Sequence, residues 1–145
     1  MHIFDVINRK GDAVVTVVPD IDVRTLLAVL AEHRIGAVVV SVDGAAVDGI
    51  VSERDIVRAL AARGASVLSE PVSSIMTAEV RTCTPDVSLR DLAQQMTEGR
   101  YRHAPVLVDG RLSGIVSIGD IVKSRISELE VERDSLSDYV VRAAT

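Results

Sequence analysis

The chain has 145 residues, of which 48% are hydrophobic and only 2% aromatic, so aliphatic side chains must build its core and its valines favour strands. Its formal net charge of −5 argues against nucleic acid as the main partner, because neutralising phosphates requires a basic surface. No uncharged apolar stretch approaches the ~18 residues of a transmembrane helix, and no Cys/His cluster has zinc spacing, so we expect a cytoplasmic protein that engages neither a membrane nor a metal.

The chain contains an internal duplication. Residues 13–60 and 79–125 align with an offset of 66, which falls to 65 after one deletion in a turn. The tetrad Gly-Ile-Val-Ser at 49–52 recurs at 114–117, and Asp-Ile-Val follows it in both copies. So many identities in the same order indicate a repeated structural unit.

In chain order, each copy starts with a short strand, Val14–Val18 in the first copy and Val80–Thr84 in the second. A Pro-Asp turn follows, and Asp22 or Ser88 can then cap a helix. The later expected elements are strands at Ala37–Val42, Val47–Val51, Ala104–Val108 and Leu112–Val116, hairpin turns at 43–44 and 109–110, and helices that begin near Glu53 and near Ile118 or Gly119. Each copy is therefore a β-α-β-β-α unit.

The tail from Asp120 to Val141 has a long helical pattern. Apolar side chains recur at steps of three, four or seven, at Val122, Ile126, Leu129, Leu136 and Val140. Only Arg133 interrupts this stripe. Two interpretations remain open: an amphipathic helix packed on its own subunit, or a helix that pairs with a second chain.

The most informative chemistry lies where a strand meets a helix. Ser52 precedes Asp55 by three residues, and Ser117 precedes Asp120 in the same way. The serine can cap the helix, and a carboxylate near the helix N-terminus can accept both hydroxyls of a ribose while free N–H groups hold phosphate oxygens. Helix capping without a ligand is the alternative, and the recurrence of the spacing in both copies favours a ligand.

On these motifs the chain resembles a tandem pair of cystathionine-β-synthase (CBS) domains, the Bateman module. The segments that carry the resemblance are Arg34–Val40, Gly49–Ile56, Tyr101–Val106 and Gly114–Ile121. Small stand-alone bacterial CBS-pair proteins are the most similar. The resemblance implies an α/β (α+β) fold in which two β-α-β-β-α repeats pack pseudo-symmetrically, followed by a long C-terminal helix.

The expected boundaries follow from the duplication and from the breakers between the copies. Repeat 1, with the N-terminal segment, spans 1–62, a linker spans 63–71, repeat 2 spans 72–125, and the C-terminal helix spans 126–145. A helical turn at Val72–Met76 leads into the second copy, with Phe4–Asn8 as its counterpart.

The resemblance also implies a function, namely a non-catalytic sensor that binds AMP, ADP, ATP or NAD in clefts between the repeats, with no obligatory cofactor. The family also binds S-adenosylmethionine, and it usually forms homodimers. The residues implied at the ligand are Thr16, Val17, Ile35, Gly36, Ala37, Ser52, Arg54 and Asp55, and in the second copy Thr82, Cys83, Tyr101, Arg102, His103, Ala104, Pro105, Ser117 and Asp120. The alternatives are a dimerisation module without a ligand and a regulatory subunit that acts in trans on an unidentified enzyme or transporter.

The two clefts are expected to differ. Arg54 at a helix start and the Arg102-His103 pair can meet phosphates, although a solvated arginine and a structural salt bridge are equally open interpretations. The second copy has Ile118-Gly119 in place of Glu53-Arg54. Cys83 is expected to be a small core residue. No catalytic residue is predicted, because no nucleophile–base pair or phosphate-binding glycine loop is present.

Overall fold

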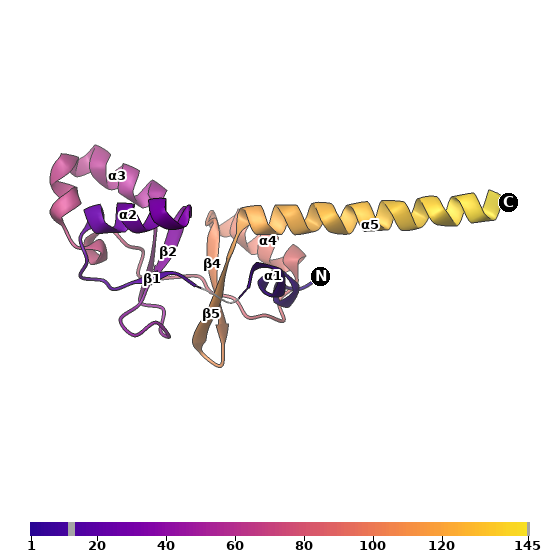
Figure 1. The fold of residues 1–145 in the computed structure, drawn as a ribbon, viewed down its shortest axis with the longest axis horizontal. Coiled ribbons are helices and arrows are strands. Elements are labelled where there is room, and N and C mark those ends of the chain that lie inside the picture. The colour runs from indigo at the N-terminus through magenta and orange to yellow at the C-terminus, as the bar shows by residue number, and fades with distance from the viewer. Residues whose placement is uncertain (12–13, 145) are drawn as a thin grey trace.

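The computed structural model describes residues 1–11 and 14–144 (Figure 1). Residues 12, 13 and 145, which belong to the expected first repeat and C-terminal helix, lie outside the described residues.

The chain forms two mixed α+β halves and a long final helix, which confirms the expected fold class. The first half comprises β1 (Thr16–Val17), α2 (Val23–His33), β2 (Ala37–Val40), β3 (Gly49–Ser52) and α3 (Glu53–Arg63). The second half comprises α4 (Leu89–Gly99), β4 (His103–Val108), β5 (Arg111–Ser117) and the start of α5 (Ile118–Ala144).

Helices α2 and α4 begin at the capping residues that the sequence predicts. The Asp22 carboxylate accepts the N–H of Thr25 at 2.7 Å and starts α2, and the Ser88 hydroxyl accepts the N–H of Asp91 at 3.1 Å and starts α4. Each side chain satisfies a backbone donor that a helix N-terminus leaves unpaired. Both caps were predicted from the sequence.

The sheets are smaller than predicted. β1 pairs parallel to β2, which pairs antiparallel to β3, but the expected strand at 80–84 is reduced to one bridge between Cys83 and Val106. The Cys83 N–H donates to the Pro105 carbonyl at 2.9 Å. The next rung of a parallel ladder would need an N–H from Pro105, and proline has none, so the strand stops there.

The two expected hairpins differ from each other. Asp109 and Gly110 have φ of 51° and 77° and join β4 directly to β5, as predicted. The turn at Asp43 does not close a tight hairpin, because β3 starts only at Gly49. The Asp43 carboxylate instead accepts the N–H groups of Ala45 and Ala46, both at 2.9 Å, and these local bonds hold a longer loop.

The segment that precedes each repeat packs against the other half of the molecule. Helix α1 (Ile3–Lys10) contacts β5 and α5 and buries Ile3 and Val6 in the core of the second half. The short helices η1 (Gly64–Ser69) and η2 (Val72–Ser74) bury Val67 and Val72 in the core of the first half. The segment that precedes one repeat therefore completes the core of the other. The boundaries at residues 62, 71 and 125 stay a prediction.

Helix α5 is continuous over 27 residues and extends well beyond the rest of the molecule (Figure 1). Its only buried residues are Ile121 and Ser124, near its start. The stripe residues are 52–63% exposed, so packing of the stripe on its own subunit, one of the two interpretations, is wrong. Among the described residues, no helix combines the length and apolarity needed to span a bilayer.

Candidate functional site

A cleft of about 370 Å³ lies between the two halves. The first half contributes the residue just before β2, part of β3 and the start of α3. The connection between the halves contributes residues 77–81, and the second half contributes the segment that enters β4. The residues that line the cleft are Gly36, Ile50, Ser52, Glu53, Arg54, Asp55 and Arg58, then Thr77, Glu79, Val80 and Arg81, and finally Arg100, Tyr101, Arg102 and His103.

Ser52 and Asp55 form a reciprocal capping box at the start of α3. The Asp55 Oδ2 atom accepts the backbone N–H of Ser52 at 2.9 Å and its hydroxyl at 3.1 Å, and the Asp55 N–H points to Ser52 Oγ at 3.4 Å. Within the described part of the chain, the hydrogen bonds to this carboxylate all involve Oδ2. The carboxylate is thus held in place by one oxygen, and Oδ1 remains available to a ligand in the cleft.

The corresponding box in the second half carries an extra cation. Asp120 Oδ2 accepts the Ser117 N–H at 2.9 Å and also the Lys10 ammonium at 2.8 Å. Lys10 Nζ donates to the Ile115 carbonyl as well, at 3.0 Å. In the first half the Ile50 carbonyl accepts instead from the backbone N–H of Thr77, at 2.8 Å. The two Ser/Asp pairs therefore share their capping geometry but have different surroundings.

The pKa of Asp120 reflects this cation. Partial burial raises the pKa, but the hydrogen bonds from Lys10 and Ser117 and the charge of Lys10 outweigh burial, so the pKa lies below its usual value. A carboxyl with a lowered folded-state pKa adds stability at neutral pH, and that stability is lost as the pH falls through the folded pKa.

We therefore expect Lys10→Met to lower the free energy of unfolding at pH 7 by up to about 1 kcal/mol, and by progressively less as the pH falls through the lowered pKa of Asp120 and the carboxyl becomes protonated. Urea unfolding over a series of pH values from neutral to acid measures the difference. The matched control is Arg9→Met, which removes an exposed neighbouring charge that has no ion pair with a described residue. Equal pH dependence in the two variants would contradict the role given to Lys10.

The cleft is more basic than the chain as a whole. Five arginines line it against three carboxylates, although the chain has a net charge of −5. The guanidinium of Arg81 lies 5.6 Å from the ring centre of Tyr101, so a cation–π contact holds this arginine over the ring. Such a lining favours an anionic ligand.

His103 contributes differently from the arginines. Burial lowers its pKa, and the nearby charges of Arg102 and Lys10 lower it further. The imidazole is therefore neutral at physiological pH and offers one donor and one acceptor rather than a charge. The positive potential of the cleft comes from the arginines.

The structure brings only part of the predicted site together. The predicted residues that line the cleft are Gly36, Ser52, Arg54, Asp55, Tyr101, Arg102 and His103. The prediction assigned Gly36 and the Tyr101–His103 segment to different clefts, whereas the structure puts them in one. The predicted residues outside its lining are Thr16, Val17, Ile35, Ala37, Thr82, Cys83, Ala104, Pro105, Ser117 and Asp120.

Several of the residues outside the cleft belong to the cores. Val17, Ala37, Cys83 and Ala104 are at most 7% exposed, so their side chains pack among aliphatic neighbours. Burial raises the pKa of Cys83 to about 11, which keeps the thiol protonated, and its predicted place in the core is confirmed.

The prediction missed the contribution of the connection between the halves. Thr77, Glu79, Val80 and Arg81 line the cleft because the Thr77 backbone pairs with Ile50 and carries the following residues along its edge. The only signal in the sequence was the position of this segment just before the second copy. Long-range pairing of this kind leaves no local pattern.

Comparison with known proteins gives a consistent result. The family model described as CBS domain matches residues 4–62 and 72–127. The mitochondrial CBS domain-containing protein CBSX3 of Arabidopsis thaliana is 38% identical over 115 residues, which cover 77% of this chain and 56% of that protein. The chain thus matches little more than half the length of this plant relative. The CBS domain-containing protein YhcV of Bacillus subtilis is 31% identical over 114 residues, which cover 79% of this chain and 80% of YhcV.

Solved structures share the fold. The CBS-domain containing protein ATU1752 of Agrobacterium tumefaciens is 47% identical with a TM-score of 0.83, over 86% of this chain and 99% of that chain. The CBS domain pair of protein MJ0100, solved with 5′-methylthioadenosine and S-adenosyl-L-methionine, has a TM-score of 0.77 over 88% of this chain and 98% of that chain. Its sequence is 24% identical, a likeness that shows the fold alone.

Proposed function

The chain belongs to the CBS domain family, and from this premise we propose that it is a regulatory module whose cleft at Asp55 binds a phosphate-bearing adenosine ligand, namely AMP, ADP, ATP or NAD. The observation that carries the proposal is the combination of a free carboxylate oxygen with an arginine-rich lining in one cleft. Asp55 and Ser52 would hold the ribose hydroxyls.

The phosphates would meet two kinds of donor. At the N-terminus of α3 the Glu53 N–H already donates to the Gly36 carbonyl and the Asp55 N–H points to Ser52 Oγ, so this terminus would offer the backbone N–H of Arg54 and the positive end of the helix dipole. Arg54 and Arg102 reach the same cleft from opposite halves and can bind phosphate oxygens with two hydrogen bonds each. A ligand bound in this way would bridge the halves.

The charge of the cleft supports phosphorylated ligands over S-adenosylmethionine. The CBS pair of MJ0100 binds 5′-methylthioadenosine and S-adenosyl-L-methionine, so this fold can accommodate an adenosine. S-adenosylmethionine carries a sulfonium cation, which an excess of arginines would repel, whereas phosphates would be attracted.

No catalytic family is indicated for the chain. We propose that ligand binding acts by biasing the relative placement of the two halves, and that a protein partner or a second copy of the chain reads that placement. A homodimer that works in the cytoplasm, without an obligatory cofactor, is part of this proposal. A dimerisation module without a ligand is the second candidate, and the exposed stripe on α5 favours it.

Thermal unfolding in the presence of AMP, ADP, ATP, NAD, adenosine and S-adenosylmethionine tests the proposal. A ligand at a hundred times its Kd stabilises the native state by about 2.7 kcal/mol, so at least one phosphorylated ligand should raise the Tm by several degrees. Adenosine and S-adenosylmethionine should raise it less. The absence of a shift with every compound would favour the dimerisation module, and an equal shift with S-adenosylmethionine would contradict the charge argument.

A further inference from the structure

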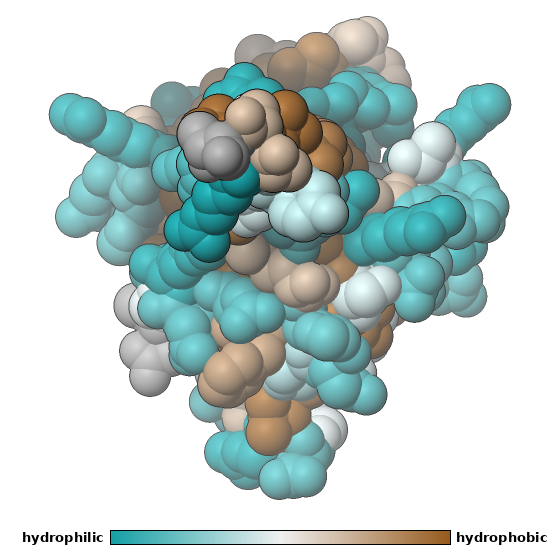
Figure 2. All heavy atoms as spheres, turned by 90° about the vertical axis from the view of Figure 1, so that its right-hand side faces the viewer, coloured by the Kyte–Doolittle hydropathy of each residue, from teal (hydrophilic) through white to brown (hydrophobic). Residues whose placement is uncertain are grey.

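Helix α5 presents a hydrophobic surface that the rest of the described chain does not cover. Ile126, Leu129 and Leu136 are 52–63% exposed, although each is a large apolar side chain. Figure 2 looks toward the free end of α5 and shows brown hydrophobic surface beside teal hydrophilic surface there. Exposed apolar area on this scale normally marks a site of association.

The spacing on α5 is that of a coiled coil. Steps of four and three residues alternate along one face without a break, through Val122, Ile126, Leu129, Arg133, Leu136, Val140 and Ala143. An average of about 3.5 residues per step keeps this seam in contact with a second helix over several turns. Arg133 is the one polar residue in the seam, and a single polar residue there commonly sets the register of a pair.

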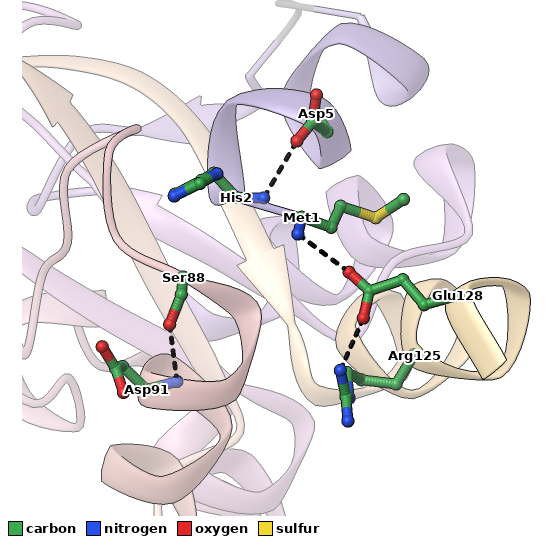
Figure 3. A network of polar contacts seen from close by, with 7 residues as sticks. All are labelled: Met1, His2, Asp5, Ser88, Asp91, Arg125 and Glu128. Atoms are coloured by element: carbon green, nitrogen blue, oxygen red, sulfur yellow. Dashed lines mark hydrogen bonds and ion pairs between the residues drawn. The ribbon is translucent and has the colours of Figure 1, made fainter. Parts of the chain in front are cut away.

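The start of α5 is fixed to the body of the protein. Glu128 forms ion pairs with the N-terminal ammonium of Met1 at 3.1 Å and with Arg125 at 2.5 Å (Figure 3). Figure 3 also shows the neighbouring caps that hold the adjacent segments, from His2 to Asp5 and from Ser88 to Asp91. These contacts give the helix a defined direction as it leaves the body, so its free part is presented in one orientation.

We propose that the face of α5 from Val122 to Ala143 pairs with the same face of a second copy in a parallel two-stranded coiled coil. The charges beside the seam support this partner. A parallel pair brings Arg125 next to the partner's Glu130, where opposite charges meet. It also sets the seam residue Arg133 next to the partner's Arg133, and the Glu132 of each chain lies beside the opposite Arg133 and offsets this repulsion.

An antiparallel pair fits less well. Centred on the free part of the helix, beyond the buried Ser124, it places Glu130 near the partner's Ser137 and Glu132 near the partner's Tyr139, so no opposite charges meet. A shift toward the start of α5 would bring Arg125 next to the partner's Glu132. That shift would drive the last turns of the partner helix against the end of β5 (Arg111–Ser117), which is part of the body.

Cysteine cross-linking tests the pairing and its direction. Leu136→Cys puts a thiol in the seam, and a parallel pair brings it next to the same residue of the partner. Val131→Cys is the matched control, because Val131 is 65% exposed on the opposite face. The native Cys83 is buried and does not compete. Under mild oxidation of the full-length protein, we expect Leu136→Cys to form a covalent dimer at least roughly tenfold faster than Val131→Cys, because pairing raises the effective thiol concentration.

Light scattering on the wild-type protein gives the second measurement, with an expected mass of twice the 15.5 kDa chain. A monomer at micromolar concentration would overturn the proposal, because the stripe on α5 would then not bind a second copy of the chain. A dimer in which Leu136→Cys cross-links no faster than the control would also overturn it, because the pairing would be antiparallel or lie on another surface. Neither result depends on whether a nucleotide binds.

Discussion

Asp55→Asn is expected to weaken nucleotide binding by roughly 10- to 100-fold. The substitution removes a charged acceptor, and a hydrogen bond to a charged group is worth about 1.5–3 kcal/mol. Asparagine keeps one oxygen, which can still accept the Ser52 N–H and preserve the helix cap. The loss would therefore fall on the ligand rather than on the fold.

Asp120→Asn is the matched control for this prediction. It makes the same change in the second capping box, where Lys10 already neutralises the carboxylate. We expect an affinity change of less than about threefold, because the lost acceptor lies outside the cleft lining. Calorimetric titration with the ligand that gives the largest thermal shift measures both variants. Equal losses in the two variants would show that both Ser/Asp pairs bind ligand, and unchanged affinity for Asp55→Asn would refute the assignment of the site.

Ile3→Ala is expected to lower the free energy of unfolding by about 2–4 kcal/mol, the usual cost of truncating a fully buried isoleucine. Ile3 is 0% exposed and packs with Leu89 and Leu92 in the core of the second half. The size of the effect follows from the exchange of segments, because the N-terminal helix fills a core more than 80 residues away in the sequence.

Phe4→Ala provides the control for the N-terminal helix. Phe4 is the next residue, is 56% exposed, and should change the free energy by no more than about 0.5 kcal/mol. Urea unfolding followed by circular dichroism compares the two variants. Similar small effects would mean that α1 is dispensable to the second core.

Much of the fold could be predicted because it depends on interactions between near neighbours. The caps at Asp22 and Ser88, the turn at 109–110 and the Ser-x-x-Asp boxes each join residues no more than three positions apart. The duplication then extended each local inference to a second copy. These features do not depend on how the halves meet, so one sequence was enough to place them.

The composition of the cleft required the tertiary structure. Gly36 and His103 line one cleft because the two halves pack against each other, and Arg81 joins them because Thr77 pairs with Ile50. No local pattern links residues this far apart. The missing strand at 80–84 has a similar origin: it follows from Pro105 in the partner strand, which limits the pairing of the two strands without changing the propensity of residues 80–84.

The sequence by itself therefore determined the repeated unit, its caps, its family resemblance and the two Ser/Asp pairs. Only the tertiary structure decided that these pairs are unequal, that the entry segments are exchanged, and that the stripe on α5 is exposed. The physical reason is that propensity, capping and turn chemistry act over a few residues, whereas the neighbours of Asp55 and Asp120 come from segments brought together by packing. The lysine beside Asp120 comes from the far end of the chain, and this contact adds a difference between the two Ser/Asp pairs that the substitution of Ile118-Gly119 for Glu53-Arg54 did not predict.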